Sequence, residues 1–171
     1  MNPFIRTHSG QRVYLLRPKA ASLRIEDVAH ALSQIVRFTG HCAGPYTVAQ
    51  HCCHCADMAP REHKLSALLH DTQETWVGDC ATPLKVCMAQ YQEIEERFER
   101  LVARKWRLPN PHPATIKEID RRMLVTEMKC LLPGSDYQSF PWTPYDLRIR
   151  VWSHAKAKRE FMKRFRRLFR A

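Results

Sequence analysis

The sequence predicts an all-α protein with a short β-hairpin near its start. Three observations favour this fold class. Apolar residues recur at helical spacing over most of the chain, glycine and proline gather in a few short stretches, and no internal repeat or linker divides residues 1–171. A hydrophobic content of 44% and a charged content of 26% are typical of globular proteins. We therefore expect a single helical domain, long enough to bury a core.

The elements are expected in a simple order. Two short extended pieces lie within residues 4–17, around the turn pair Ser9-Gly10. Helices follow over residues 25–36, 48–60, 62–77, 85–106, 115–131 and 145–169. Thr47 is expected to cap the second helix, and Thr115 with Glu118 forms a capping box for the fifth. The connections are a glycine-rich loop over residues 37–45, a rigid connector at Pro109, Pro111 and Pro113, and an irregular stretch between Pro133 and Pro144.

The net charge limits the possible partners, and the cysteine content indicates the redox environment. A net charge of +11 predicts attraction to polyanions, so nucleotides, nucleic acids and anionic membranes all remain open on that ground. No apolar run approaches the ~20 residues that span a bilayer, and the start lacks the pattern of a signal peptide. Seven cysteines without a secretion signal indicate reduced thiols. We therefore expect a cytoplasmic protein, in a host cytoplasm if its gene is viral, that needs no membrane.

Residues 66–85 carry the densest set of chemically active side chains. An apolar helical lead-in delivers the adjacent pair His70-Asp71, and Glu74 follows on the same helical face as Asp71. Asp79 is expected in the loop beyond this helix. An imidazole and a carboxylate side by side can bind one divalent cation, because His is a nitrogen ligand and Asp a hard oxygen ligand. Glu74 and Asp79 then remain free to handle protons.

His51 and Asp120 supply the partners that the His70-Asp71 pair needs. Each lies within an expected helix and is flanked by apolar residues, so each projects near a buried face. Alone, such a His is more often a hydrogen-bonded core residue, and such an Asp more often a salt-bridge partner. Together the residues give the order His, His-Asp, Asp, and a fourfold coincidence is much rarer than any single one.

That order resembles the HD-domain metal-dependent phosphohydrolases, and specifically their 5′-deoxynucleotidase branch. The matching stretches are Arg37-Phe38-Thr39-Gly40-His41, Pro45 to His51, His70 to Lys85 with Glu74, Gly78, Asp79, Thr82 and Pro83 in place, and Ile119-Asp120 through Leu124 and Glu127. They cover roughly residues 5–130. The Asp71-to-Asp120 spacing is closest to small phage enzymes that dephosphorylate dATP, whereas the bacterial deoxynucleoside monophosphatases are longer there. Phe38 departs from the pattern, since the monophosphatases usually carry Trp, and sugar or base selectivity is left open.

The resemblance implies a site as well as an HD-domain helical bundle. A divalent metal ion (Co, Mn, Zn or Mg) would be held by His51, His70, Asp71 and Asp120. Glu74 and Asp79 would be the catalytic carboxylates that orient or deprotonate a water and serve the leaving oxygen, with the division between them open. Substrate contacts would come from Arg37, Phe38, His41, Thr82, Lys85 and Lys117. Taken alone, Lys85 and Lys117 are interpreted equally well as solvated surface lysines.

The cysteine cluster Cys52-Cys53-His54-Cys55 contains a Cys-x-x-Cys pattern. A zinc finger needs a second pair at suitable spacing, and the sequence has none. Buried, reduced cysteines on a helix are therefore the better interpretation.

The expected last helix, residues 145–169, is strongly basic. Between Leu147 and Ala171 the only acidic residue is Glu160, and the ten basic residues are Arg148, Arg150, Lys156, Lys158, Arg159, Lys163, Arg164, Arg166, Arg167 and Arg170. We favour a docked amphipathic helix with a solvated basic face. The alternatives are an anionic-membrane helix or a nucleic-acid-binding tail.

Two functional classes follow from these patterns. The first is a phosphohydrolase that removes phosphate or triphosphate from free deoxynucleotides, dATP first, with a 5′-deoxynucleotidase acting on deoxynucleoside monophosphates as the alternative. The second is a non-catalytic nucleic-acid-binding protein, which only the basic helix supports. A nucleic-acid-binding module does not require candidate metal ligands and additional carboxylates at these spacings, so we favour the enzyme. We expect a deoxynucleotide as partner, a homo-oligomer as the assembly, and no requirement for nucleic acid.

Overall fold

The computed structural model describes residues 2–109 and 114–170. A two-stranded antiparallel sheet, β1 (Phe4–Arg6) with β2 (Arg12–Tyr14), precedes the helices. The helices are α1 (Ile25–Leu32), α2 (Val48–Met58), α3 (Lys64–Leu69), α4 (Glu74–Val77), α5 (Thr82–Lys85), α6 (Ala89–Lys105), α7 (Ala114–Leu131) and α8 (His154–Phe169). Short 3-10 turns are η1 (Ala20–Ser22), η2 (Phe38–Gly40), η3 (Arg61–His63) and η4 (Tyr137–Ser139). The predicted all-α class with an N-terminal hairpin is confirmed.

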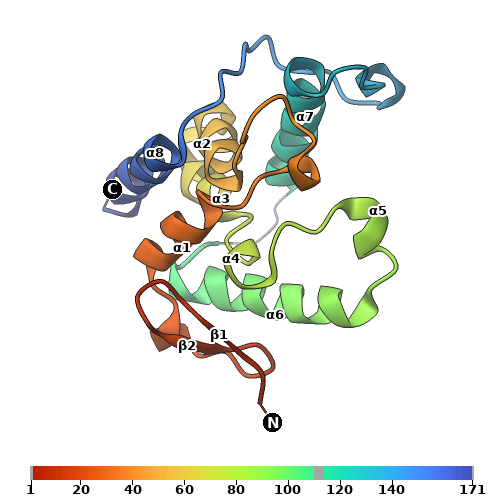
Figure 1. Cartoon of the computed structure of the whole chain (residues 1–171). Coiled ribbons are helices and arrows are strands. Elements are labelled where there is room, and N and C mark those ends of the chain that lie inside the picture. The colour runs from red at the N-terminus through yellow and green to blue at the C-terminus, as the bar shows by residue number, and fades with distance from the viewer. Residues whose placement is uncertain (1, 110–113, 171) are drawn as a thin grey trace.

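The helix α2 lies at the centre of the fold. It contacts α1, α3, α7 and α8. In Figure 1, α8 and α7 flank α2 and α3 on opposite sides, and α6 runs below them beneath α4 and α5. Because neighbours surround α2, nearly all of its side chains are buried, including Gln50, His51 and the cysteines Cys52, Cys53 and Cys55. The cysteines are free and reduced, as expected.

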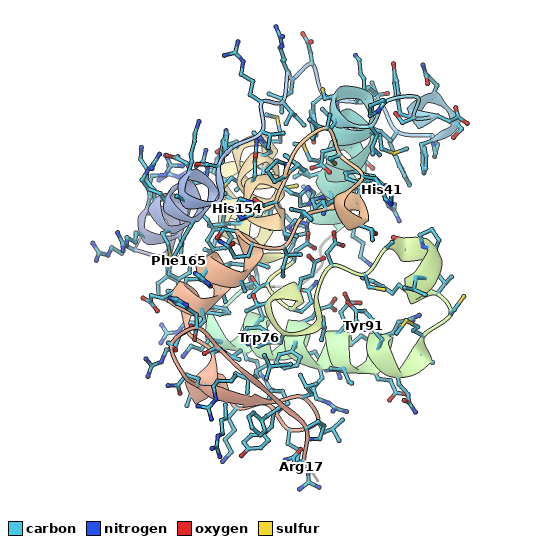
Figure 2. The ribbon with its side chains drawn as sticks, viewed as in Figure 1. Arg17, His41, Trp76, Tyr91, His154 and Phe165 are labelled. Carbon is cyan, nitrogen blue, oxygen red and sulfur yellow. The ribbon has the colours of Figure 1, made fainter. Side chains whose placement is uncertain are left out.

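Aromatic side chains hold α6 and α8 against this centre. Trp76 of α4, labelled in Figure 2, stacks on Phe98 of α6 with ring centroids 4.9 Å apart. On α8, Phe161 and Phe165 are buried where the helix packs on α1, α2 and α3. Burying a large apolar side chain stabilises a fold by about 1.5–3 kcal/mol. These aromatic contacts therefore fix α6 on α4, and α8 on α1, α2 and α3.

The hairpin is tied to α1 through Asp27. Its carboxylate accepts hydrogen bonds from the hydroxyls of Thr7 and Ser9, both at 2.7 Å, and from the backbone N–H of Ser9 at 2.8 Å. Burial raises the pKa of Asp27, but the bonds from Ser9 and Thr7 lower it by more, so the pKa lies below its usual value. The ionised carboxylate thus fastens the β1–β2 turn to the helix.

Helix α1 is shorter than predicted, because its last residues leave the helix before Val36. The Ser33 hydroxyl donates to the carbonyl of His30 at 2.7 Å and ends the helix there. Val36 then pairs with Thr47 in an isolated antiparallel bridge. The bridge closes the loop over residues 37–45, and it sets the start of α2, where the Thr47 hydroxyl accepts the Gln50 N–H as predicted.

Three further predicted boundaries were wrong. The continuous helix over residues 62–77 is broken into η3, α3 and α4 by a turn at residues 70–73, and the helix over 85–106 begins only at Ala89, after α5. The capping box is also wrong, because α7 begins at Ala114 and so places Thr115 inside the helix. Pro111 and Pro113 of the predicted connector lie outside the described residues.

The last helix begins at His154 rather than near residue 145, because the preceding strap is anchored to α2. Gln50 donates from Nε2 to the Arg150 carbonyl, and its Oε1 accepts the Trp152 N–H, both at 2.8 Å. These bonds require an extended backbone over residues 150–152, and Ser153 then caps α8 by accepting the Lys156 N–H.

Helix α8 is docked along one face and basic along the other. Arg164 is drawn back onto the body by a bidentate contact with Asp57, at 3.0 and 2.7 Å. The favoured interpretation of this helix, docked with a solvated basic face, is therefore confirmed. Among the described residues, no helix has both the length and the apolar character to cross a membrane.

Candidate metal site

Four side chains predicted as metal ligands converge from three parts of the chain. His51 comes from α2, His70 and Asp71 from the turn after α3, and Asp120 from α7. The Nε2 atom of His51 lies 3.2 Å from His70 Nε2, 3.4 Å from Asp71 Oδ2 and 3.2 Å from Asp120 Oδ1. His70 Nε2 lies 3.2 Å from Asp71 Oδ2 and 3.7 Å from Asp120 Oδ1. The sequence order His, His-Asp, Asp thus corresponds to one cluster, which we call the metal cluster.

His70 and Asp71 lie where the predicted helix is interrupted, in the turn over residues 70–73. Their side chains reach the same point, with His70 Nε2 3.2 Å from Asp71 Oδ2. His70 Nδ1 also lies 2.8 Å from the carbonyl of Ala67, to which it donates, so the neutral ring carries its lone pair on Nε2. The Ala67 carbonyl therefore sets the tautomer of this ligand.

A fully buried carboxylate, Glu127, fixes the tautomer of His51. Its Oε1 lies 2.6 Å from His51 Nδ1 and accepts the Tyr46 hydroxyl at 2.8 Å, while Oε2 accepts Arg37 Nε–H at 3.1 Å. Burial raises the pKa of Glu127, but Arg37 and His51 lower it by more, so the carboxylate is ionised. With Nδ1 donating to Glu127, His51 presents Nε2 to the metal cluster. Sequence reasoning assigned Glu127 no role, although it lies two helical turns after Asp120 on the same face of α7.

The donor set fits a divalent cation. Ligand atoms about 2.1 Å from a tetrahedral ion lie about 3.4 Å apart, which is close to the separations within the metal cluster. Two imidazoles and two carboxylates are a donor set that suits Zn, Mn or Co, whereas a site made only of oxygen ligands suits Mg or Ca. Cys55 Sγ lies near the same ligand atoms, 3.6 Å from His51 Nε2 and 3.9 Å from Nδ1. Burial raises the pKa of Cys55 to about 11, which favours the neutral thiol over the thiolate that binds metal ions.

Two carboxylates beside the metal cluster retain protons more readily than usual. Burial, with the nearby charges of Asp71 and Asp79, raises the pKa of Glu74 well above its usual value. Burial also raises the pKa of Asp79, and Arg37 opposes this only in part. Glu74 Oε2 is buried without a hydrogen-bond partner among the described residues. A buried carboxylate oxygen without a partner is costly, so this atom is well placed to receive a hydrogen bond from a ligand or a water.

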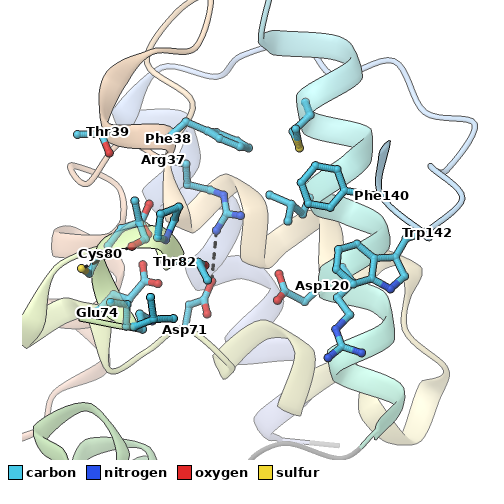
Figure 3. Close-up of a pocket in the computed structure, with 18 residues that line it drawn as sticks. Arg37, Phe38, Thr39, Asp71, Glu74, Cys80, Thr82, Asp120, Phe140 and Trp142 are labelled. Atoms are coloured by element: carbon cyan, nitrogen blue, oxygen red, sulfur yellow. Dashed lines mark hydrogen bonds and ion pairs between the residues drawn. The ribbon is translucent and has the colours of Figure 1, made fainter. Parts of the chain in front are cut away.

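The metal cluster opens into a pocket of about 710 Å³, a size usual for small-molecule sites. Figure 3 shows two different walls, with Arg37, Asp71 and Asp120 between them. Glu74, Cys80 and Thr82 lie on one side, and Phe140 and Trp142 on the other. The pocket thus combines a polar wall, an acidic centre and an aromatic wall.

The predicted substrate residues divide into two groups. Arg37, Phe38, Thr82 and Lys85 line the pocket, and Lys85 also contacts Glu95 at 2.7 Å. His41 and Lys117 are exposed and lie outside the residues that line it. Lys117 was expected to contact the substrate, but it lies outside the pocket lining although it is three residues before Asp120 on α7.

Phe38 is held in the pocket wall by an unusual backbone. Phe38 and Thr39 have φ values of 54° and 53°, in the left-handed region that favours glycine, and Gly40 follows at 82°. The guanidinium carbon of Arg37 lies 5.6 Å from the centre of the Phe38 ring. Left-handed geometry costs about 1–2 kcal/mol for a residue with a Cβ. The wall that contains Phe38 is therefore strained locally.

Sequence reasoning missed the aromatic wall and Arg121. Leu124 and Met128 of α7, with Phe140 and Trp142 beyond it, line the pocket together with Arg121. For the α7 residues a signal was present, since Asp120, Leu124 and Met128 recur every four positions on one helical face. The segment over residues 137–144 offered none, because its path depends on long-range contacts such as the Tyr145 N–H bond to the Thr126 hydroxyl.

Two bacterial proteins are similar to this chain. One, named only as uncharacterized protein YfdR of Escherichia coli K12, is 36% identical over 137 residues, which are 80% of this chain and 76% of that protein. The other, uncharacterized protein RCAP_rcc00048 of Rhodobacter capsulatus, is 35% identical over 119 residues, or 64% of this chain and 61% of that protein. No family model matches the chain. The extent of the first similarity establishes that this chain belongs to the same family as E. coli YfdR.

Proposed function

We propose that this protein is a metal-dependent phosphohydrolase of the HD-domain type that acts on free deoxynucleotides. The observation that carries the proposal is the metal cluster itself, in which Nε2 of His51 and of His70 lie 3.2 Å apart and 3.2–3.7 Å from carboxylate oxygens of Asp71 and Asp120, two residues that line the pocket. The resemblance of residues 5–130 to the 5′-deoxynucleotidase branch gives the substrate class.

The residues around the metal cluster suit hydrolysis of a phosphate ester. A bound divalent ion would polarise a phosphoryl oxygen and lower the pKa of a water. Glu74 and Asp79, whose pKa values are raised by burial and by neighbouring carboxylates, hold a proton more readily than an ordinary carboxylate, which suits a general base or a general acid. Arg37 carries a positive charge at the pocket wall, where charge develops on the phosphoryl oxygens.

The number of phosphates removed depends on how much positive charge the pocket offers. The spacing between Asp71 and Asp120 favours dATP, as the sequence resemblance suggests. A second candidate, a deoxynucleoside monophosphatase, is favoured by the position of His41 and Lys117, which lie outside the pocket lining and so leave fewer cations for distal phosphates.

A substrate panel tests the proposal. Ribo- and deoxynucleotide mono- and triphosphates are assayed with Mn²⁺, Co²⁺, Mg²⁺ and Zn²⁺, separating the release of phosphate from that of triphosphate. We expect deoxynucleotides to be hydrolysed in preference to ribonucleotides. Failure to hydrolyse any member with any metal, by a protein that binds the metal, would contradict the proposal.

Variants then assign the roles. Glu74→Gln should keep the metal and lower kcat by about 10²-fold or more, the scale of general acid–base groups. Exposed Glu93→Gln on α6 is the matched control and should have no effect. Lys85→Ala should raise KM for dATP more than for dAMP if distal phosphates are bound there, and equally for both if the protein is a monophosphatase.

A further inference from the structure

One face of α7 leads away from the metal cluster along the pocket. Asp120, Leu124 and Met128 are spaced every four residues and all line the pocket. With a rise of 1.5 Å per residue, Leu124 lies about 6 Å and Met128 about 12 Å along the helix from Asp120. A ligand anchored at the metal cluster by a phosphate would therefore extend along an apolar surface.

Two aromatic rings stand on the same side of the pocket as α7. Phe140 and Trp142 follow η4 and have ring centroids 5.7 Å apart, with 29° between their planes. The guanidinium carbon of Arg121 lies 5.3 Å from the centre of the Trp142 ring. Phe140 is 37% exposed although it lines a concave surface. Figure 3 shows both rings across the pocket from Glu74 and Cys80, with Asp71 and Asp120 between the two sides.

This wall suits a flat ring better than it suits further phosphates. Apart from the indole N–H of Trp142, its side chains Phe140, Leu124 and Met128 offer no hydrogen-bond donor to an anion, and the Arg121 cation beside it already lies over the Trp142 ring. Exposed aromatic surface in a pocket gains most from a planar, polarisable partner that displaces its water. Every nucleobase has such a face, and stacking on an aromatic side chain tolerates any base.

We propose that Phe140 and Trp142, continued by Leu124 and Met128, form a wall that binds the nucleobase of the substrate. This proposal rests on the proposed function in one respect, since the phosphate is taken to lie at the metal cluster. It assigns a role to residues 137–144, which lie beyond the stretch that resembles the deoxynucleotidases.

The first test compares substrates with and without a base. Trp142→Ala should raise KM for dAMP by about 10- to 100-fold, the scale of lost stacking, with little change in kcat. It should leave kcat/KM for 2-deoxyribose 5-phosphate unchanged, because that substrate has no base. Trp142→Leu keeps apolar bulk without an aromatic face and should resemble Trp142→Ala. The control is Phe169→Ala, which removes an exposed aromatic ring on α8. Equal losses on both substrates would overturn the proposal.

The second test does not depend on turnover. Saturation-transfer NMR of deoxyadenosine with the metal-free protein should show the strongest transfer at the base protons, and Trp142→Ala should abolish it while circular dichroism stays that of the wild type. Transfer that survives in this variant, or that is strongest at the sugar, would refute the base-binding wall. If deoxyadenosine binds in this way but no nucleotide is hydrolysed, the wall stands and the phosphohydrolase proposal fails.

Discussion

Replacing Glu127 by Gln should damage both the stability of the fold and the metal cluster. The carboxylate is fully buried and its three partners, His51 Nδ1–H, the Tyr46 hydroxyl and Arg37 Nε–H, are all donors. A glutamine of the same size has one acceptor oxygen and one NH₂ group, so at least one donor must face another donor. It also removes the fully buried charge that pairs with Arg37 Nε, and leaves Asp71, 3.6 Å from Arg37 Nη1, as the remaining acidic partner.

The magnitude follows from these contacts. Breaking a buried ion pair by removing one partner costs about 3–5 kcal/mol. For a chain of this length that corresponds to a fall in melting temperature of roughly 6–20 °C. Because His51 loses the acceptor that fixes its tautomer, the affinity for metal should also fall by about 10- to 100-fold.

Calorimetry can measure both effects. Thermal unfolding of the metal-free protein gives the first, and titration with Mn²⁺ or Co²⁺ gives the second. Glu118→Gln, an exposed substitution on the same helix, is the matched control and should change neither. If Glu127→Gln unfolds at the wild-type temperature and binds metal with unchanged affinity, the buried carboxylate neither stabilises the fold nor positions His51 toward the metal cluster.

Three further results are expected. His70→Ala should lose bound metal, measured by elemental analysis, and turnover together while circular dichroism shows a folded helical protein; unchanged metal content would contradict the ligand assignment. Asp27→Asn should lower the free energy of unfolding by about 2 kcal/mol, the scale of hydrogen bonds to a charged group. Because the folded pKa of Asp27 is lowered, this difference should be present above about pH 4, the unfolded pKa, and disappear as pH falls through the folded pKa, which urea titrations at several pH values would show. Phe161→Ala, at a fully buried position of α8, should cost about 3–5 kcal/mol in the same assay, and a cost below about 1 kcal/mol would mean that α8 is not docked through this ring.

Local signals predicted the type of each element better than its ends. The Thr47 cap and the Ser9-Gly10 turn are set by neighbouring residues, so the sequence predicts them correctly. The helix over residues 145–169 failed because Gln50, about a hundred residues earlier, holds the strap before it in an extended form. No periodicity within the segment could reveal that anchor.

The candidate site also combines residues that the sequence predicts with residues that only the tertiary structure brings in. His51, His70, Asp71 and Asp120 were predicted from spacing and resemblance, and the structure brings them together. The apolar periodicity of residues 62–77 conceals the break after α3, where His70 and Asp71 lie. The aromatic wall could not be predicted at all, because Trp142 reaches the pocket only through the tertiary path of the chain after α7.

The left-handed run at residues 38–40 has a consequence for engineering this protein. Thr39→Gly should relax the backbone and release about 1 kcal/mol or more of strain in the folded state. The greater freedom of glycine in the unfolded chain offsets part of this gain. The same change would loosen the frame that holds Phe38 against the pocket and Arg37 beside it. A screen for heat-resistant variants would therefore tend to select substitutions here that broaden the range of accepted ligands, so heat resistance and selectivity would have to be improved at separate positions.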